Sequence, residues 1–376
     1  MDRILYVVTE DWYFWSHRLP IARAAKSNGY DVWVVAREGS HADQIRDEGF
    51  TFIGWDLKRG SANPWHEVRS LVELCRIYGC ARPTIVHHVA IKPVLYGAIA
   101  AWIMRVPHVV NALMGLGFVF SSHWKASFIR PFVRRLFYLL LNRSNSLLII
   151  QNRDDAHLFV HEVGVAAERL KLVRGSGVDV RHYLPFPEPS GLITFALVGR
   201  MLKDKGIYEF VEAVRKLRKE NISFRACLVG RPDPENPSSI DLKVLEGWQK
   251  SGVIEWMGHR DDIATVWRKS HVAVLPSYRE GLPKSLLEAA ACGRPLIATD
   301  VPGCREIVID NVNGILIAPH SSEMLAHAMK RMIVNKPLRQ SMGKGSRKLA
   351  EEEFSDRVVV EQIMALYQSQ LVLRRA

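Results

Sequence analysis

Two carboxylates in the C-terminal half of the chain have a spacing and a setting that could hold a sugar. Glu280 and Glu288 are separated by seven residues within "SYREGLPKSLLEAAACGRPLIATDVPGCREIV". The preceding "HVAVLP" predicts a strand that ends near Pro276, and "KSLLEAAACG" predicts a helix after a Gly-Leu-Pro turn. Glu280 is thus expected at the carboxyl end of a strand. A carboxylate accepts hydrogen bonds from adjacent sugar hydroxyls, and a helix N-terminus suits a phosphate.

A group of cations occupies an equivalent place earlier in the chain. In "ALVGRMLKDKGIYEFVEAV", Arg200, Lys203 and Lys205 follow a predicted strand that ends at Gly199 and precede a helix that opens near Gly206. Cations between a strand end and a helix start suit a diphosphate, which Arg grips through two oxygens and Lys meets as a point charge. Each motif alone also fits a solvated surface, but their shared position at strand ends favours a ligand site.

The order of the predicted elements indicates a doubly wound α/β protein. Short apolar strands alternate with longer helical patterns, which predicts parallel strands with helices on both faces. The series restarts after the Pro-rich "LPFPEPSGL". We therefore predict two Rossmann-like domains at 1–183 and 193–354, joined by a linker at 184–192, with a cleft between them as the ligand site.

Composition narrows the class of partner. The chain has 376 residues and a net charge of +12, which indicates an anionic partner such as a phosphorylated ligand, a membrane or a nucleic acid. No Asp or Glu occurs from Leu74 to Arg153, where ten Lys or Arg residues lie. No nucleic-acid-binding pattern accompanies this excess. The five cysteines lack metal spacing and suit a reduced compartment, and no apolar run is long enough to span a bilayer.

The motifs together resemble a known family. "GRMLKDKG", "EGLPKSLLEAAACGRPLIATDVPGCREIV" and "NGILIAP" resemble the family 4 glycosyltransferases of the GT-B fold. "EDWYFWSHRLPIARAAKSNGYDV", "HHVAIKPVLYGAIAA" and "GLGFVFSS" are similar to the branch that builds bacterial O-antigen, capsule and exopolysaccharide. The resemblance covers essentially the whole chain. It implies a retaining enzyme without metal or cofactor that moves a sugar from a nucleotide sugar, with UDP favoured, to a polyprenyl-diphosphate-linked acceptor.

The resemblance also implies roles for individual residues. Arg200 and Lys205 would bind the donor diphosphate, Glu288 the ribose hydroxyls and Glu280 the donor sugar, with the amides around Gly281 and Leu282 reaching sugar and phosphate. No compelling DxD metal motif appears, and Asp261-Asp262 is interpreted as a helix start. In proteins of this fold the last helix generally crosses back to the first domain, which here would be the amphipathic segment at about 355–376.

The first domain supplies fewer definite candidates. Many family members have a histidine before the glycine in the loop after the strand "VVNAL", but Met114 stands there. His17, which we add to the catalytic candidates, and Lys92 follow predicted strand ends. His87 and His88 could equally be satisfied histidines within a strand. The remaining candidates for the cleft or the acceptor are Glu10, Asp11, Ser16, Gly115 and Gly117.

A basic, aromatic-rich segment predicts contact with a membrane. "FVFSSHWKASFIRPFVRRLFYLLLNR" contains no acidic residue and carries Lys125, Arg130, Arg134 and Arg135. Such a helix suits an anionic bilayer surface, here the cytoplasmic face of the bacterial inner membrane, although an ordinary basic outer face is the alternative. Two other functions remain open: another GT-B enzyme such as a nucleotide-sugar epimerase, and a non-enzymatic protein that binds membranes or anions.

Overall fold

The protein consists of two units with separate sheets. The computed structural model describes residues 1–57, 63–114 and 124–375, of which 124–130 and 373–375 are described by their backbone alone. Unit 1 comprises Met1–Ser176 with Val359–Ala376, and unit 2 comprises Gly177–Val358. The Pro-rich stretch at 184–192 therefore belongs to unit 2. The two parallel sheets confirm the predicted doubly wound α/β class.

The sheet of unit 1 has strands in the order β3-β2-β1-β4-β5-β6-β7, all parallel. Its central strands β4 and β5 are buried along their whole length, as expected where helices cover both faces of a sheet. Their carboxyl ends therefore meet at one edge. The strands are β1 (Arg3–Glu10), β2 (Asp31–Arg37), β3 (Thr51–Gly54), β4 (Ile85–Val89), β5 (His108–Leu113), β6 (Ser146–Ile150) and β7 (Leu170–Leu172).

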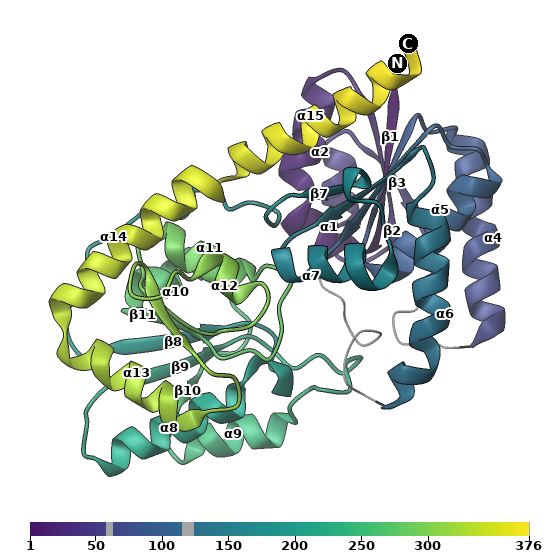
Figure 1. The fold of residues 1–376 in the computed structure, drawn as a ribbon. Coiled ribbons are helices and arrows are strands. Elements are labelled where there is room, and N and C mark those ends of the chain that lie inside the picture. Colours follow the sequence, from purple (N-terminus) through teal and green to yellow (C-terminus); the bar gives the residue numbers. More distant parts are fainter. Residues whose placement is uncertain (58–62, 115–123, 376) are drawn as a thin grey trace. The chain divides into compact units, whose positions relative to one another are not determined.

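Two helical layers enclose this sheet. One core joins the sheet to the first two helices and to the last helix, and a second core joins its other face to α4 and α5 (Figure 1). From Val359 onward the last helix belongs to unit 1. The helices are α1 (Asp11–His17), α2 (Leu19–Ser27), α3 (Ala42–Asp47), α4 (Pro64–Ala81), α5 (Ile91–Ile103), α6 (Trp124–Leu141), α7 (Arg153–Leu158) and α15 (Asp356–Arg375). Short turns η2 (Phe159–Val163) and η3 (Ala167–Arg169) follow α7.

Unit 2 repeats the arrangement with a parallel sheet in the order β10-β9-β8-β11-β12-β13. These strands are β8 (Thr194–Val198), β9 (Arg225–Val229), β10 (Glu255–Trp256), β11 (Val272–Leu275), β12 (Leu296–Thr299) and β13 (Gly314–Ile317). Its helical elements are η4 (Lys203–Lys205), α8 (Ile207–Lys219), α9 (Leu242–Lys250), α10 (Ile263–Lys269), α11 (Lys284–Ala291), α12 (Cys304–Ile307), α13 (Ser322–Val334) and α14 (Lys336–Glu353). Helices α8, α9 and α13 pack on one face of the sheet, and α10, α11, α12 and α14 on the other.

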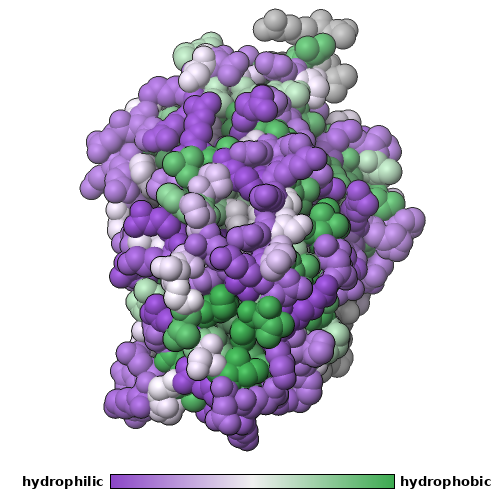
Figure 2. Space-filling view, turned by 90° about the vertical axis from the view of Figure 1, so that its left-hand side faces the viewer, coloured by the Kyte–Doolittle hydropathy of each residue, from purple (hydrophilic) through white to green (hydrophobic). Residues whose placement is uncertain are grey.

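The surface carries the polar faces of these amphipathic helices. Figure 2 shows one side of the molecule, where hydrophilic residues predominate and hydrophobic residues gather in a patch in its lower half. Among the described helices, none has the length and the apolar character needed to cross a membrane.

Candidate active site

The loop that carries Glu280 is held between two neighbouring strand ends of unit 2. Gly206 has φ +69°, and a Cβ there would lie 2.0 Å from the carbonyl oxygen of Pro276, so only glycine allows this approach. The Tyr278 amide donates to the carbonyl of Asp204 at 2.9 Å. On the opposite side, the Glu280 amide donates to Pro302 O at 3.2 Å. The loop after β11 is thus fixed at the carboxyl edge of the sheet.

This clamp brings together the cation and the carboxylate singled out from the sequence. Lys205 Nζ lies 2.5 Å from Glu280 Oε1, which also accepts a hydrogen bond from Ser277 Oγ at 2.6 Å. Both charged side chains are largely enclosed. Residues 75 positions apart thereby form one ion pair, because their strands β8 and β11 are neighbours in the sheet.

Arg200 lies at the same edge but is paired with an acid that sequence reasoning missed. Its Nη1 donates to Asp233 Oδ2 at 2.7 Å, and nearly half of the Arg200 side chain is exposed. Asp233 lies in the loop after β9, whose polar "GRPDPENP" was the only available signal. Arg200 and Lys205, the two cations to which the family resemblance assigns the diphosphate, are therefore each paired with a carboxylate of unit 2.

Glu288 occupies an enclosed position on α11. It is 8% exposed, and burial raises the pKa of its carboxyl, while Lys284 and the Tyr183 hydroxyl lower it in part. Helix α11 begins at Lys284 with Pro283 as its N-cap, and Gly281 and Leu282 precede it. The carboxylate is enclosed on this helix, and a ligand that donates hydrogen bonds would favour its charged form.

The candidate residues of unit 1 differ in how many of their polar atoms already make hydrogen bonds within the protein. His17 stacks on Tyr13 with ring centroids 4.2 Å apart, and Ser16 Oγ lies 2.6 Å from its Nδ1. His88 is fully buried, with Nε2 against Tyr78 Oη at 2.7 Å and Nδ1 against Asn111 Oδ1 at 2.8 Å. Burial lowers the pKa of His88 to about 4. Both ring nitrogens of His88 are therefore engaged in hydrogen bonds, which fits the alternative of a structural histidine within a strand.

The other first-unit candidates are equally specific in their contacts. Lys92 Nζ pairs with Glu67 Oε1 of α4 at 3.0 Å. Glu10 lies 3.6 Å from Arg37 Nη1, and Asp11 Oδ2 accepts from the amides of Gly39 and His41 at 2.8 Å each. The predicted candidates Gly115 and Gly117 lie outside the described residues.

Helix α6 contains the predicted membrane-facing cations. The side chains of Lys125 and Arg130 lie outside the described part of the helix. Arg134 pairs with Glu162 of η2, whereas the Arg135 guanidinium lies 5.3 Å from the centre of the Tyr138 ring. Glu162 lies outside the stretch from Leu74 to Arg153, in which the sequence contains no acidic residue.

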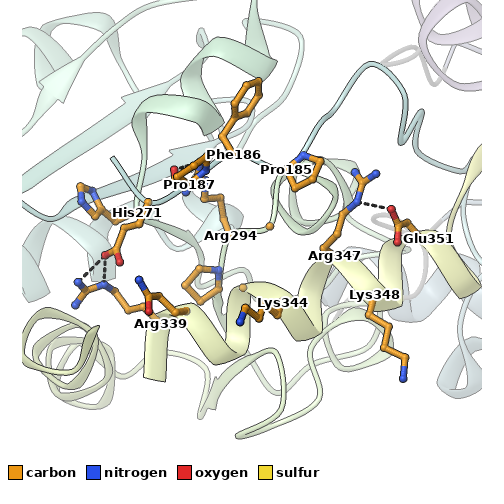
Figure 3. Close-up of a pocket in the computed structure, with 15 residues that line it drawn as sticks. Pro185, Phe186, Pro187, His271, Arg294, Arg339, Lys344, Arg347, Lys348 and Glu351 are labelled. Carbon is orange, nitrogen blue, oxygen red and sulfur yellow. Dashed lines mark hydrogen bonds and ion pairs between the residues drawn. The ribbon is translucent and has the colours of Figure 1, made fainter. Parts of the chain in front are cut away.

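A pocket of about 560 Å³ lies at the opposite edge of the unit 2 sheet (Figure 3). His271 and Pro295, which directly precede β11 and β12, mark it as the amino edge. Its arginines tie segments of the chain together: Arg339 pairs with Glu188, and Arg347 points toward Glu351 and donates to backbone carbonyls. This pocket is therefore separate from the Lys205–Glu280 pair.

The acidic pair considered as a possible metal motif starts a helix, as predicted. Asp262 is the N-cap of α10 and pairs with Arg260 at 2.7 Å, while Asp261 contacts His259. Within the described ranges, no three His, Cys, Asp or Glu side chains cluster as metal ligands.

Comparison with solved structures defines the class of protein to which this fold belongs. Anabaena HepE in complex with UDP and glucose is 18% identical and aligns with a TM-score of 0.80 over 98% of this chain and all of that chain. Sucrose-phosphate synthase from Thermosynechococcus elongatus gives a TM-score of 0.81 at 18% identity, covering 99% of this chain and all of that one. These likenesses establish the GT-B fold of glycosyltransferases.

The sequence models then specify the family. The model "Glycosyl transferases group 1" matches residues 185–349, and "Glycosyl transferase 4-like" matches residues 3–152. The chain belongs to this family of glycosyltransferases, as the motifs indicated.

Two curated relatives cover nearly the whole chain at 25% identity. One is the Campylobacter jejuni N,N'-diacetylbacillosaminyl-diphospho-undecaprenol alpha-1,3-N-acetylgalactosaminyltransferase, over 93% of this chain and 94% of that protein. The other is the Escherichia coli UDP-Gal:alpha-D-GlcNAc-diphosphoundecaprenol alpha-1,3-galactosyltransferase, over 90% and 89%. Both names describe transfer of a sugar to a lipid-diphosphate-linked acceptor.

Proposed function

We propose that this glycosyltransferase moves a sugar from a UDP-sugar to a hydroxyl of a polyprenyl-diphosphate-linked glycan, with retention of the anomeric configuration and without a metal ion. The Lys205–Glu280 pair at the carboxyl edge of unit 2 carries the proposal. It sets a cation for phosphate beside a carboxylate for hydroxyls. Such a pairing of groups suits a sugar that is attached to a diphosphate. The relatives' names support the lipid-linked acceptor.

The chemistry follows from where charge develops. As the bond between the sugar C1 and the phosphate oxygen breaks, negative charge grows on the diphosphate. Lys205, together with Arg200 and the first turn of α11, would stabilise that charge in place of a metal. Glu280 and Glu288 would accept from hydroxyls of the sugar and the ribose. The acceptor oxygen would attack the face that the diphosphate leaves and pass its proton to a departing phosphate oxygen, which retains configuration without a protein nucleophile.

The existing ion pairs give the unliganded site a defined resting state. Asp233 and Glu280 neutralise Arg200 and Lys205, so the cations are held without the cost of an unpaired charge. An incoming diphosphate offers more negative charge than either carboxylate and bidentate geometry for Arg200. Glu280, released from Lys205, would then be available to the sugar.

A direct test combines turnover with stereochemistry. The protein is incubated with a panel of UDP- and GDP-sugars and a lipid-diphosphate-linked acceptor in the presence of EDTA, and NMR defines the anomeric configuration of the product. We expect transfer with retention, and its loss in folded Arg200→Ala and Glu288→Ala variants. Full activity of folded Glu288→Ala, an inverted product, or activity only with added metal would each contradict the proposal. Conversion of a nucleotide sugar without acceptor would instead indicate an epimerase.

We also propose that unit 1 binds the inner face of an anionic membrane through α6 and the end of α5. Phe132 is 72% exposed and Trp102 is 56% exposed, and the Arg143 guanidinium lies 5.4 Å from the Trp102 ring. Exposed aromatic side chains beside arginines suit the boundary between lipid headgroups and acyl chains. This surface would bring the enzyme to a membrane-anchored acceptor.

A further inference from the structure

A buried arginine of unit 1 has no counterion among the residues that the structure describes. Arg18 joins α1 to α2 and is 1% exposed. Its Nη2 donates to Met114 Sδ at 3.0 Å, and its Nε has no hydrogen-bond partner. Among the described residues, no carboxylate lies within ion-pair distance of it. A thioether is a weak acceptor, so the guanidinium charge is almost uncompensated.

The nearby polar groups do not relieve this charge. Tyr367 Oη lies 3.1 Å from Tyr6 Oη and 2.5 Å from His87 Nδ1, so these groups are engaged with one another. Burial, with a contribution from Arg18, lowers the pKa of His87 and keeps that ring neutral. The acids of the adjoining β1–α1 segment are also committed, since Glu10 pairs with Arg37 and Asp11 binds backbone amides.

An unpaired buried charge destabilises a fold, so its presence needs a reason. Moving a charged side chain out of water is costly unless the charge is paired and hydrogen-bonded. Arg294 is similarly buried, but it donates to the carbonyls of Pro187 and Arg268. Within the described part of the chain, the Arg18 guanidinium donates to no oxygen atom, and its hydrogen-bond acceptor is the Met114 sulfur.

Its location indicates an anion from outside the chain. Met114 directly follows β5, and Arg18 follows the helix that begins where β1 ends. Arg18 therefore lies at the carboxyl edge of the unit 1 sheet, the edge at which doubly wound sheets bind ligands. It is also adjacent to His17 and Ser16.

We infer that Arg18 is a binding residue for a diphosphate group of the substrates, with Met114 as its displaceable cover. This deepens the proposed function and rests on it for the identity of the diphosphate. Met114 is only half-buried, and its three rotatable bonds allow the side chain to turn away from the guanidinium. A phosphate oxygen would replace the sulfur with a charge-assisted hydrogen bond, roughly twice as strong as a neutral one.

The experiment isolates unit 1 from the cations of unit 2. In an Arg200→Ala/Lys205→Ala background, we expect pyrophosphate to raise the melting temperature by several degrees. Adding Arg18→Met should abolish that rise without lowering the melting temperature of the unliganded protein, because an uncompensated charge is removed. Arg18→Lys should keep part of the response. Arg23→Met, which alters an exposed arginine on α2, is the matched control and should respond fully.

Several outcomes would overturn the inference. They are the absence of any pyrophosphate response in the unit 2 background, a response that persists in Arg18→Met, and loss of response in both Arg18 variants with a lowered melting temperature. The last would mark a structural role. Met114→Ala should strengthen the response and Met114→Leu should not, since leucine still covers the guanidinium. A weaker response of Met114→Ala would also contradict the assignment.

Two further measurements distinguish whether Arg18 binds the diphosphate of the lipid-linked acceptor or that of the nucleotide donor. Geranyl diphosphate and UDP serve as probes for the lipid-linked and nucleotide forms, and in the active enzyme Arg18→Met should raise KM for the matching substrate alone. An equal loss with both probes and no change in either KM would contradict substrate binding. If the wild-type protein transfers no sugar but its pyrophosphate response depends on Arg18, the proposed function fails and the anion site stands.

Discussion

The carboxyl edges of the two sheets differ in whether their cationic side chains have a carboxylate partner. In unit 2, Lys205 and Arg200 each have a carboxylate partner within 2.7 Å. In unit 1, Arg18 is buried against a methionine sulfur. In an ion pair, a phosphate can replace the carboxylate as the partner of the cation. A buried cation without a partner lowers the stability of the unliganded fold, and a bound anion would remove that cost. If the proposed sites are right, both edges would bind an anion: the unit 2 edge by exchanging a carboxylate for it, and the unit 1 edge by adding it to an unpaired cation.

Removing a cation from the paired edge should have the largest effect on activity. We expect Lys205→Ala to lower kcat by about 10²–10³, the usual cost of losing one group that stabilises developing charge. Lys203→Ala, on the exposed side of the same turn, is the matched control and should remain near wild type. Steady-state kinetics on proteins of equal helical content measures the contrast. Comparable losses in both variants would contradict a specific role for Lys205.

Glu288 tests whether an enclosed carboxylate serves ligand binding rather than stability. Because burial raises its pKa, it gains protons on folding and lowers stability above that pKa, so Glu288→Gln should melt at the same or a higher temperature at pH 7. Transfer should fall about tenfold to a hundredfold, as for lost hydrogen bonds to a charged group of about 1.5–3 kcal/mol. In wild type, activity should decline at a less acidic pH than for an exposed glutamate. A less stable but fully active variant would refute this role.

The proposed membrane-binding surface on α6 of unit 1 is tested by single substitutions. We expect Arg135→Ala to weaken binding to vesicles containing anionic lipid about fivefold, since each cation near such a surface contributes about 1 kcal/mol. Phe132→Ser should weaken it further, because Phe132 is exposed and apolar. Co-sedimentation with anionic and neutral vesicles measures both, with the exposed Arg225→Ala of unit 2 as a charge-matched control. Equal binding by all variants would remove the proposed membrane surface.

The resting pair Arg200–Asp233 gives the smallest expected effect. Asp233→Ala should lower the KM for the donor about two- to fivefold, because a partly exposed ion pair contributes about 0.5–1 kcal/mol and would no longer compete with the diphosphate. An unchanged or higher KM would mean that Asp233 positions Arg200 rather than substituting for the ligand.

The sequence was most informative where local chemistry and element order agreed. Strand ends at Pro276 and Gly199 placed Glu280 and Lys205 at one sheet edge, and the direct Lys205–Glu280 contact follows from β8 and β11 being neighbours. Strand order is a tertiary property, so the pattern predicted a shared edge but not the ion pair. Asp233 was missed because its partner belongs to another loop.

Burial explains the remaining differences. Arg18 sits in "SHRLP" among polar and apolar neighbours that give no sign of a buried charge, and only the packed structure reveals it. His88 has the residue type of a catalytic group, but its hydrogen bonds to Tyr78 and Asn111 come from α4 and β5. Residue type and spacing indicate chemistry, while availability depends on partners that are distant in sequence.

The position of bound nucleotide tests the central claim most directly. In a crystal structure of the protein with UDP, we predict that the diphosphate contacts Lys205 Nζ and Arg200, with Glu288 at the ribose hydroxyls and Asp233 and Glu280 displaced from their cations. A nucleotide bound instead in the pocket lined by Arg339 and Arg347, with the Lys205–Glu280 pair intact, would contradict the account.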